Sequence, residues 1–427
     1  MFDEKIAQLR GYAEKAGISS KVMEDLSVMK ARHEMKIRTR VNGVQENFQL
    51  MLGLHCNPHS TGARPYKGGF RFHPKVSMDL LSALALDMTE KCALAKLPFG
   101  GAKMGIVIDP TKYTPETLRS VTEQATEQLL RQKLIHPDIY VPGPDVGTNS
   151  DTMFWMYNKV AEWNVLAGMP NVPAVVTGKP LSHDGCPGRE DATSRGLLLL
   201  LRRYLKLSGC NRGSSTVAIQ GFGNVGMNIA KLINEEFHGF RVVALSDVAG
   251  AIASPEGFNM WDVLRYYGDN KTFAGYENDK FRLKEKEDVL YFPADVLIPA
   301  ALENQITEKN VHQVQAQLVV EAANEAVTPS AQKILEDRGI VFIPGIAANA
   351  GGVTVSYLEW SRNRGTRSHE VDAAEELKGV HQRLEKIMHN IMWKAFSYAN
   401  EKRCSIAEAA HALALRDIAA LLQMKHK

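Results

Sequence analysis

The sequence of 427 residues is poor in the features that mark secreted, membrane-bound or nucleic-acid-binding proteins. Its five cysteines are scattered and odd in number, so we expect no disulfide framework and a reducing compartment, the cytoplasm. No apolar run approaches the roughly 20 residues of a membrane span, and residues 1–17 lack the apolar core of a signal peptide. The net charge is only +3, without a basic block interleaved with aromatic residues. We therefore expect a protein that binds neither membranes nor nucleic acid.

The sequence also lacks the ligand spacings of a metal site. The segment HCNPH, from His55 to His59, places two histidines and a cysteine in a turn with a proline, but it matches none of the zinc spacings. We therefore predict that the protein holds no metal.

The composition that is present, 44% hydrophobic and 23% charged residues, is typical of a globular protein with an ample core. The length predicts two domains, and the pattern changes near residue 180, after which short strands and helices alternate. This alternation predicts an α/β fold with a doubly wound parallel sheet. We place the domains at 1–180 with 371–427 and at 181–370, the C-terminal amphipathic helices packing back on the first domain or bridging the two.

The motif GFGNVG, Gly221 to Gly226 with Gly223 between, lies directly after a predicted strand and opens a predicted helix. In this context the glycines let the backbone approach a pyrophosphate, and the helix N-terminus favours its negative charge. The alternative is a merely tight turn between strand and helix. We predict a Rossmann-like dinucleotide-binding domain.

Asp247 follows Gly226 by 21 residues and ends the next predicted strand. That spacing is typical of the carboxylate that binds a ribose hydroxyl, and a carboxylate repels the 2′-phosphate of NADP. We therefore expect NAD to be favoured over NADP, although Arg241, at the start of the same strand, is a cation that could alter this preference.

Three lysines of the first domain occur where apolar residues or glycines surround them. Lys91 continues the apolar stripe of a helix capped by Ser77, where snorkelling of its ammonium to water is the alternative interpretation. Lys67 adjoins the first glycine pair, 68–69, and Lys103 follows closely on the second, 100–101. Glycines leave room for another molecule. Lysines that converge in one cleft require an anionic partner, and a substrate with two carboxylates provides it.

A partly desolvated lysine near other cations has a lowered pKa, so one of the three could act as a general base. The motif VPGPDVGT adds Asp145 in a loop made rigid by prolines, as a candidate proton carrier. The alternative interpretation of Asp145 is a turn-capping aspartate.

With these motifs the chain resembles the glutamate/leucine/phenylalanine/valine dehydrogenase superfamily, and within it the hexameric, short-subunit type that acts on glutamate. The resemblance covers nearly the whole length and depends on seven segments in order: YKGGFRFHP, LPFGGAKMGIVIDP, YVPGPDVGT, VPAVVTGKP, GREDATSRG, GFGNVG and NAGGVTVSYLEW. It implies a substrate-binding and oligomerisation domain followed by the dinucleotide-binding domain, assembled as a homo-hexamer.

The resemblance also implies roles for individual residues. Lys103 corresponds to the catalytic lysine that activates water and Asp145 to the aspartate that shuttles protons to the amino group. Substrate contacts are implied at four positions: Lys91 for the α-carboxylate, Met88 beside it, and Lys67 with Ser356 for the side-chain carboxylate. Coenzyme contacts are implied at four further positions: Thr193, Asn224, Asn324 and Asn349.

Some positions depart from the pattern of that family. The segment GARP, 62–65, stands where Arg-Gly-Pro is more frequent, and Ser194 and Met104 stand where glycine is common. Met88 is a glutamine in some relatives, so its contact with substrate would be apolar. None of these departures removes a catalytic group.

The implied reaction is the reversible conversion of L-glutamate, NAD and water to 2-oxoglutarate, ammonium and NADH. One alternative is a branched-chain or aromatic amino-acid dehydrogenase, against which Lys67 and Ser356 argue because a site built for a charged group rejects substrates that lack it. Another is a catalytically silent, dinucleotide-binding regulatory paralogue, against which Lys103 and Asp145 argue.

Overall fold

The computed structural model of the chain describes residues 1–41, 43–59, 64–210, 214–276, 283–365 and 372–425. The chain forms two compact units: unit 1 comprises residues 1–190, 353–382 and 412–427, and unit 2 comprises residues 191–352 and 383–411. These limits differ from the predicted domains at 383–411, which belongs to unit 2, and at 181–190, which belongs to unit 1. They also differ at 353–365, which was predicted in the second domain. That segment belongs to unit 1 because its aromatic residues Tyr357 and Trp360 pack edge-on against Phe99, with ring centroids 5.8 and 5.1 Å away. Gly62 and Ala63 of the GARP segment, and the predicted boundary residue Val371, lie outside the described residues.

Unit 1 contains a five-stranded mixed sheet of order β1-β2-β4-β3-β5. The strands β4, β3 and β5 are parallel, whereas β2 runs antiparallel to both β1 and β4. The bounds of the strands are β1 (Ala31–Val41), β2 (Val44–Leu54), β3 (Tyr66–Phe72), β4 (Gly100–Ile106) and β5 (Tyr140–Pro144).

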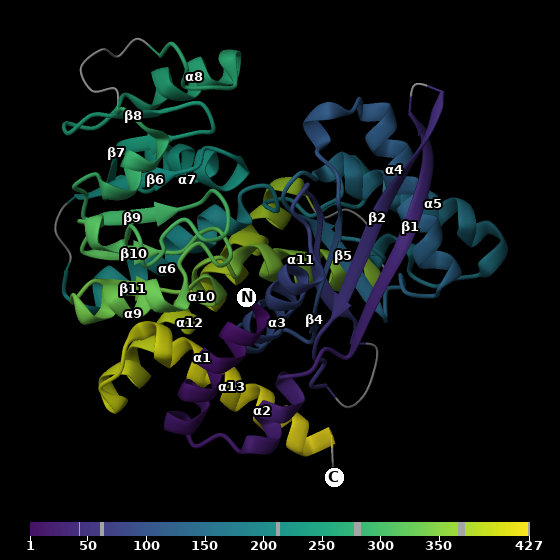
Figure 1. Ribbon diagram of the computed structural model, residues 1–427, viewed down its shortest axis with the longest axis horizontal. Coiled ribbons are helices and arrows are strands. Elements are labelled where there is room, and N and C mark those ends of the chain that lie inside the picture. The colour runs from purple at the N-terminus through teal and green to yellow at the C-terminus, as the bar shows by residue number, and fades with distance from the viewer. Residues whose placement is uncertain (42, 60–63, 211–213, 277–282, 366–371, 426–427) are drawn as a thin grey trace. The chain divides into compact units, whose positions relative to one another are not determined.

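The two faces of this sheet differ because successive side chains of a strand point to opposite sides. On one face Leu52, Phe70 and Met104 are fully buried in a core that also contains α4 (Pro115–Arg131) and α5 (Ser150–Ala167). Burial of each such side chain contributes about 1.5–3 kcal/mol. Figure 1 shows these two helices next to β1, β2 and β5.

The helix α3 (Met78–Leu94) covers the other face of the same sheet, where it packs closely on β4. Its N-terminus is capped as predicted, since the Ser77 hydroxyl accepts a hydrogen bond from the Leu80 N–H at 3.3 Å. The helices α1 (Phe2–Ala16) and α2 (Ser20–Leu26) pack with α3 in an apolar cluster.

Unit 2 contains the predicted doubly wound sheet, with the order β11-β10-β9-β6-β7-β8. Its strands are β6 (Ser215–Gln220), β7 (Phe240–Ser246), β8 (Ala251–Ala253), β9 (Val296–Pro299), β10 (Leu318–Val320) and β11 (Val341–Ile343). All are parallel except the edge strand β8, which pairs antiparallel with β7. Only four residues, 247–250, join β7 to β8, and a parallel neighbour would need a crossover of about a dozen residues or more.

Five of the described helices lie wholly within unit 2: α6 (Ala192–Leu207), α7 (Asn224–Glu235), α8 (Met260–Asn270), α9 (Pro329–Asp337) and α10 (Gly345–Ala348). The helix α11 (Gly351–Arg364) begins in unit 2 and continues into unit 1 from Val353. The helix α7 begins within the glycine motif, at Asn224, so the motif opens a helix as the sequence predicts.

The described residues of the two units also form five short 3₁₀ helices: η1 (Pro110–Lys112), η2 (Val172–Ala174), η3 (Leu181–His183), η4 (Lys286–Tyr291) and η5 (Val311–Gln313).

The C-terminal helices α12 (Ala373–Lys402) and α13 (Ile406–Lys425) contribute residues to both units. The part of α13 from Ala412 belongs to unit 1, where Leu415 and Ile418 join the apolar cluster of α1 and α3. Residues 383–411 belong to unit 2. Within the described ranges, no helix has the length and apolar character needed to cross a membrane.

Candidate active site

Three parallel strands of unit 1 carry candidate site residues on one face of the sheet. Lys67 on β3 is paired in register with Gly101 on β4, and Lys103 lies two residues further along β4, on the same face. Asp145 directly follows β5. The alternation thus directs Lys67, Lys103 and Asp145 to the side of the sheet that α3 covers. Lys67 and Lys103 are each only 3% exposed.

Lys103, Asp145 and Arg71 form a buried charge cluster. The Nζ of Lys103 is 3.0 Å from Oδ1 of Asp145, and Nε of Arg71 donates to Oδ2 at 2.7 Å. Burial on its own would raise the pKa of Asp145, but the two cations outweigh burial and hold the pKa well below its usual range. Asp145 is therefore an anion with fixed orientation, and a proton can pass directly between it and Lys103.

The glycines beside the lysines make room for the protein's own atoms. A Cβ on Gly101 would lie 2.2 Å from the carbonyl oxygen of Ala85 in α3, and a Cβ on Gly68 only 1.7 Å from that of Ala102 in β4. These glycines allow the helix and the neighbouring strand to approach closely.

The other members of the two pairs have the same function. A Cβ on Gly69 would lie 2.7 Å from Cβ of Asp145, and a Cβ on Gly100 would lie 2.7 Å from Cβ of Asn57. The expectation that the glycine pairs leave room for another molecule was therefore wrong. They let α3, Asn57 and Asp145 pack against the strands that carry the lysines.

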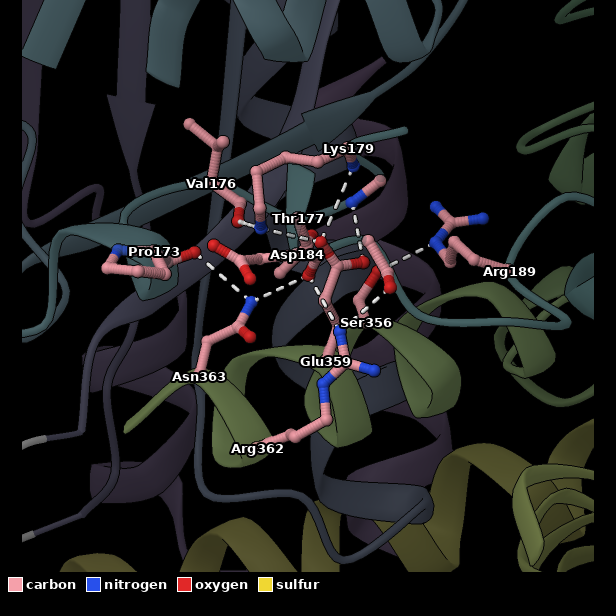
Figure 2. Close-up of polar contacts among 12 residues, drawn as sticks. Pro173, Val176, Thr177, Lys179, Asp184, Arg189, Ser356, Glu359, Arg362 and Asn363 are labelled. Carbon is pink, nitrogen blue, oxygen red and sulfur yellow. Dashed lines mark hydrogen bonds and ion pairs between the residues drawn. The ribbon is translucent and has the colours of Figure 1, made fainter. Parts of the chain in front are cut away.

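Lys67 lies beside a second arginine and a hydroxyl pair. A Cβ on Gly143 would meet Nζ of Lys67 at 2.8 Å and Oγ1 of Thr177 at 3.1 Å, so the missing side chain provides the space for this ammonium group. Burial first, and the positive charge of Arg189 second, lower the pKa of Lys67 to about 7. Arg189 in turn donates from Nε to Oγ of Ser356 at 3.1 Å (Figure 2). The predicted pair of Lys67 and Ser356 is thus accompanied by a guanidinium group.

Lys91 and Met88 come from α3. Lys91 is 5% exposed and Met88 is half-buried. Burial raises the pKa of the Cys92 thiol to about 12, against the opposing charges of Lys91 and Lys67. Both lysines therefore lie near Cys92, which brings all three predicted lysines to one part of unit 1.

Met104 and Ser194, two departures from the family pattern, have structural explanations. Met104 is fully buried and pairs with Leu52 and Phe70 on the face of the sheet opposite to Lys103. The Ser194 hydroxyl donates to the carbonyl of Val225 at 2.8 Å, and so ties the start of α6 to the glycine motif.

In unit 2 the glycine motif shows the geometry of a dinucleotide cradle. Gly221 has φ +90° and lies against Ala301, 2.8 Å from the position of an added Cβ. A Cβ on Gly226 would lie 1.9 Å from the carbonyl oxygen of Gly221, so this glycine closes the turn against the helix. Gly223, by contrast, is exposed, and no atom lies within 4 Å of an added Cβ. Space at the second glycine and tight packing at the others fit a pyrophosphate at the N-terminus of α7.

Asp247 organises the turn between β7 and β8. Its Oδ1 accepts hydrogen bonds from the N–H groups of Ala249 at 2.8 Å and Gly250 at 2.9 Å, and Oδ2 accepts one from Phe273 at 2.7 Å. A carboxylate offers about four acceptor positions. Three are occupied by the backbone, so the predicted ribose contact would use the fourth.

The structure brings together Asn324 and Asn349 at the carboxyl ends of β10 and β11. Nδ2 of Asn349 donates to Oδ1 of Asn324 at 2.9 Å and to the carbonyl of Ala322 at 3.1 Å. The buried Oδ1 of Asn349 has no hydrogen-bond partner among the residues that the structure describes, and such an atom fits a donor group of a ligand. Glu321 joins the two segments, because it accepts from the N–H groups of Val327 at 3.0 Å and Gly345 at 2.7 Å.

The two other predicted coenzyme residues are Thr193, half-buried in the first turn of α6, and Asn224, exposed at the start of α7.

Two family models match the chain. The Glu/Leu/Phe/Val dehydrogenase dimerisation domain matches residues 32–162, and the Glutamate/Leucine/Phenylalanine/Valine dehydrogenase model matches residues 185–425. The chain belongs to the Glu/Leu/Phe/Val dehydrogenase family. The first match includes Lys67, Lys103 and Asp145, and the second includes Arg189, the glycine motif and Ser356.

Curated members of this family are similar over most of the chain. A glutamate dehydrogenase of Thermotoga maritima is 38% identical over 84% of this chain and 83% of its own, and a cryptic catabolic NAD-specific glutamate dehydrogenase of Bacillus subtilis is 34% identical over 95% and 91%. Among solved structures, a hetero-hexameric glutamate dehydrogenase of Thermus thermophilus in a leucine-bound form covers 99% of this chain and 96% of its own, with 30% identity and a TM-score of 0.86.

Two arginines of the candidate site, Arg71 and Arg189, were not predicted from the sequence. Arg71 lies in the segment YKGGFRF, and the strand alternation that places Lys67 and Gly69 on one face also places Arg71 there, so this signal was present. Arg189 lies in GREDATSRG, but its partner Ser356 is 167 residues away, and no local pattern indicates that pairing.

Proposed function

We propose that this chain is a glutamate dehydrogenase, which catalyses the reversible NAD-dependent oxidative deamination of L-glutamate to 2-oxoglutarate and ammonium. The observation that carries the proposal is the contact of 3.0 Å between Lys103 and Asp145 in the buried charge cluster. A second, cationic cluster surrounds Lys67 and Arg189. One cluster suits proton transfer at an amino-bearing carbon, and the other suits a second carboxylate. The similarity to curated glutamate dehydrogenases supports the same assignment.

In this proposal each group of the substrate has a partner of suitable charge. Lys91 binds the α-carboxylate with Met88 beside it, and Lys67, Ser356 and Arg189 bind the side-chain carboxylate. Since Lys67 has a pKa near 7, an incoming carboxylate would stabilise its charged form. A neutral substrate side chain would leave this buried cationic site without a partner, which is the basis for preferring glutamate.

Lys103 and Asp145 carry the proton transfers. Nicotinamide, when bound, would supply the hydride acceptor, and loss of hydride from the substrate Cα would leave an iminium. Asp145, anionic between Arg71 and Lys103, accepts a proton from the amino group or from Lys103 at 3.0 Å. Lys103, once it has lost its proton, takes one from the water that attacks the iminium. A carboxylic acid with such a lowered pKa releases its proton readily, as a shuttle requires.

The coenzyme in this proposal is NAD in preference to NADP. Gly221, Gly223, Asn224 and Gly226 would hold the pyrophosphate, and Asp247 would accept a ribose hydroxyl. Thr193, Asn324 and Asn349 would lie near the nicotinamide. Relatives whose names specify NAD support this choice. We further place the protein in the cytoplasm, without a metal, as a homo-hexamer. The dimerisation-domain match and the hetero-hexameric neighbour support assembly into an oligomer.

The test is a comparison of NADH formation from glutamate, leucine and norvaline by the purified chain, with NAD and then NADP. We expect glutamate with NAD to give the highest kcat/KM. Equal or better turnover of leucine would assign the branched-chain alternative instead. The second alternative is a catalytically silent, dinucleotide-binding regulatory paralogue, and the leucine-bound, hetero-hexameric neighbour is a reason to test it. A homogeneous chain that binds NADH but does not turn over 2-oxoglutarate and ammonium would establish that alternative.

A further inference from the structure

A buried carboxylate, Glu359, holds the irregular segment 172–189 of unit 1 against α11 (Figure 2). Its Oε2 accepts from the N–H of Gly178 at 2.8 Å, and its Oε1 receives Nζ of Lys179 at 2.7 Å. Lys179 also donates to the carbonyl of Val176 at 2.9 Å. Both charged side chains have 0% exposure. The Lys179–Glu359 pair is therefore a fully buried ion pair.

Further contacts from the same helix fix the rest of the segment. Nδ2 of Asn363 donates to the carbonyls of Pro173 at 3.2 Å and Asp184 at 3.0 Å. Nη2 of Arg362 donates to the carbonyls of Asp184 and Gly185, each at 2.7 Å. These bonds already anchor the segment at its beginning and middle. The Lys179–Glu359 pair instead holds the part of the segment next to Thr177, because Glu359 accepts from the N–H of Gly178.

The segment held in this way carries Arg189, a member of the carboxylate-binding cluster that also comprises Lys67 and Ser356. It carries Thr177 as well, a neighbour of Lys67. Thr177 directly precedes Gly178, and its hydroxyl is near Nζ of Lys67 across Gly143. Arg189 ends the segment and bonds to Ser356, one helical turn before Glu359. A change at Glu359 would therefore act on Thr177 through Gly178, and on Ser356 through α11.

We infer that the Lys179–Glu359 pair positions the carboxylate-binding cluster of Lys67, Arg189 and Ser356 and thereby sets the preference for substrates with two carboxylates over substrates with one. The inference rests on the proposed function. Neither residue touches the substrate, so both are positioning residues.

The charge of the pair matters in addition to its packing. A buried ion pair is weak evidence for stability, because apolar residues of similar size often stabilise a fold as well or better. Glu359 is an anion close to two cations of the site: its charge raises the pKa of Lys67 and of Arg189, against the burial that lowers both. It therefore favours the charged form of the groups that would bind the second carboxylate.

The experiment compares kcat/KM for L-glutamate and L-norvaline, which share the α-carboxylate and the amino group but differ in the side-chain carboxylate. Glu359→Gln keeps the shape and an acceptor for Gly178 but removes the charge. The double variant Lys179→Met with Glu359→Gln removes both charges. We expect either to lower the glutamate-to-norvaline ratio about tenfold or more, through a higher KM for glutamate, while norvaline kinetics and NADH binding stay within about twofold.

A matched control is the buried pair of Lys5 and Asp87 in the same unit, both about 5% exposed. Lys5→Met with Asp87→Leu also removes a buried pair, but it lies on α1 and α3. Any effect through Lys91 on α3 would fall on the α-carboxylate and so on both substrates alike. We expect the control to keep the wild-type ratio.

An unchanged ratio in the Glu359 variants, with or without an equal loss on both substrates, would overturn the inference. If Glu359→Gln does not fold, the double variant decides, and if neither folds, the pair is structural and the inference is wrong. Glu359→Asp, which keeps the charge, should stay closer to the wild-type ratio than Glu359→Gln does, and the reverse order would also contradict the inference. If the wild-type chain does not turn over glutamate, the proposed function has failed instead.

Discussion

The proposed substrate-binding residues of unit 1 are buried charged side chains, whereas the proposed coenzyme-binding residues of unit 2 are glycines and backbone groups. Lys67, Lys91 and Lys103 are each 5% exposed or less. The proposed coenzyme cradle consists of Gly221, Gly223 and Gly226 with the N-terminus of α7. A small dianionic substrate is recognised by charges that burial strengthens. A large coenzyme needs close approach of the backbone. Unit 1 should therefore be sensitive to changes of charge, and unit 2 to added volume.

The largest expected effect is that of removing the catalytic amine from unit 1. Lys103→Ala should lower kcat by about 10³-fold or more, because a general acid–base group contributes typically 10²–10⁴-fold and its partner Asp145 loses its ammonium neighbour. NADH binding, measured by fluorescence titration, should remain within about twofold. Substantial residual deamination would show that Lys103 is not the base.

The second prediction contrasts two glycines of unit 2 by the volume around them. Gly226→Ala places a Cβ 1.9 Å from a backbone oxygen, so we expect a lower melting temperature and about 100-fold weaker NADH binding. Gly223→Ala adds a Cβ where no protein atom lies within 4 Å. It should leave the melting temperature unchanged and weaken NADH binding about tenfold, since the methyl group meets the pyrophosphate. Equal melting temperatures for both variants would contradict this interpretation.

The third prediction uses the titration of Lys67. Because its pKa is lowered to about 7, the free enzyme loses this charge as the pH rises above 7. The KM for 2-oxoglutarate should then rise by up to about tenfold per pH unit, whereas the KM for 2-oxovalerate should lack this component. Lys67→Met should raise the KM for 2-oxoglutarate at pH 6 and remove the pH dependence. A flat wild-type profile between pH 6 and 9 would contradict the assignment.

The smallest expected effect concerns stability, again in unit 1. Burial lowers the pKa of His55 from 6.5 to about 4, while its ring nitrogens bond to Thr89 and to the carbonyl of Leu26, both at 2.8 Å. The unfolded chain binds this proton more tightly, so stability present above pH 6.5 is lost as the pH falls toward 4, by about 3 kcal/mol at most.

Hydrogen exchange at pH 4.5 and pH 7 can locate this loss. We expect faster exchange at the lower pH in residues 20–26 and 78–94, which contact His55. The variant His55→Gln, which can form both hydrogen bonds without titrating in this range, should show a smaller change. An effect of the same size in the variant would assign the acid sensitivity to other groups.

Much of the site follows from local sequence patterns. The period of two in YKGGFRF and GGAK places Lys67, Arg71 and Lys103 on one face, and GFGNVG between a strand and a helix marks the cradle. The predicted lowering of a lysine pKa by burial and like charge occurs at Lys67, where the like charge is mainly that of Arg189. The resemblance implied the catalytic role for Lys103, which the structure pairs with Asp145.

What the sequence could not indicate depends on contacts between distant segments. The partner of Lys179 is 180 residues away, and neither residue type is expected to be fully buried. The packing function of the glycine pairs could not be predicted either, because it also depends on contacts with distant segments. The atoms nearest to an added Cβ belong to α3 at Gly101 and to Asp145 at Gly69. The antiparallel direction of β8 follows from a turn of four residues, which the short segment AIA alone does not reveal.

Successive residues of the strand β4 face two different environments. Lys103 lies on the face with Lys67 and Asp145, where we propose the chemistry. Met104, the next residue, faces the apolar core between the sheet and the helices α4 and α5. Substitutions at odd-numbered and even-numbered positions of this strand therefore test different properties, catalysis on one side and packing on the other. A protein engineer could vary Met104 together with Leu52 and Phe70 to tune thermal tolerance while leaving the reacting groups in place.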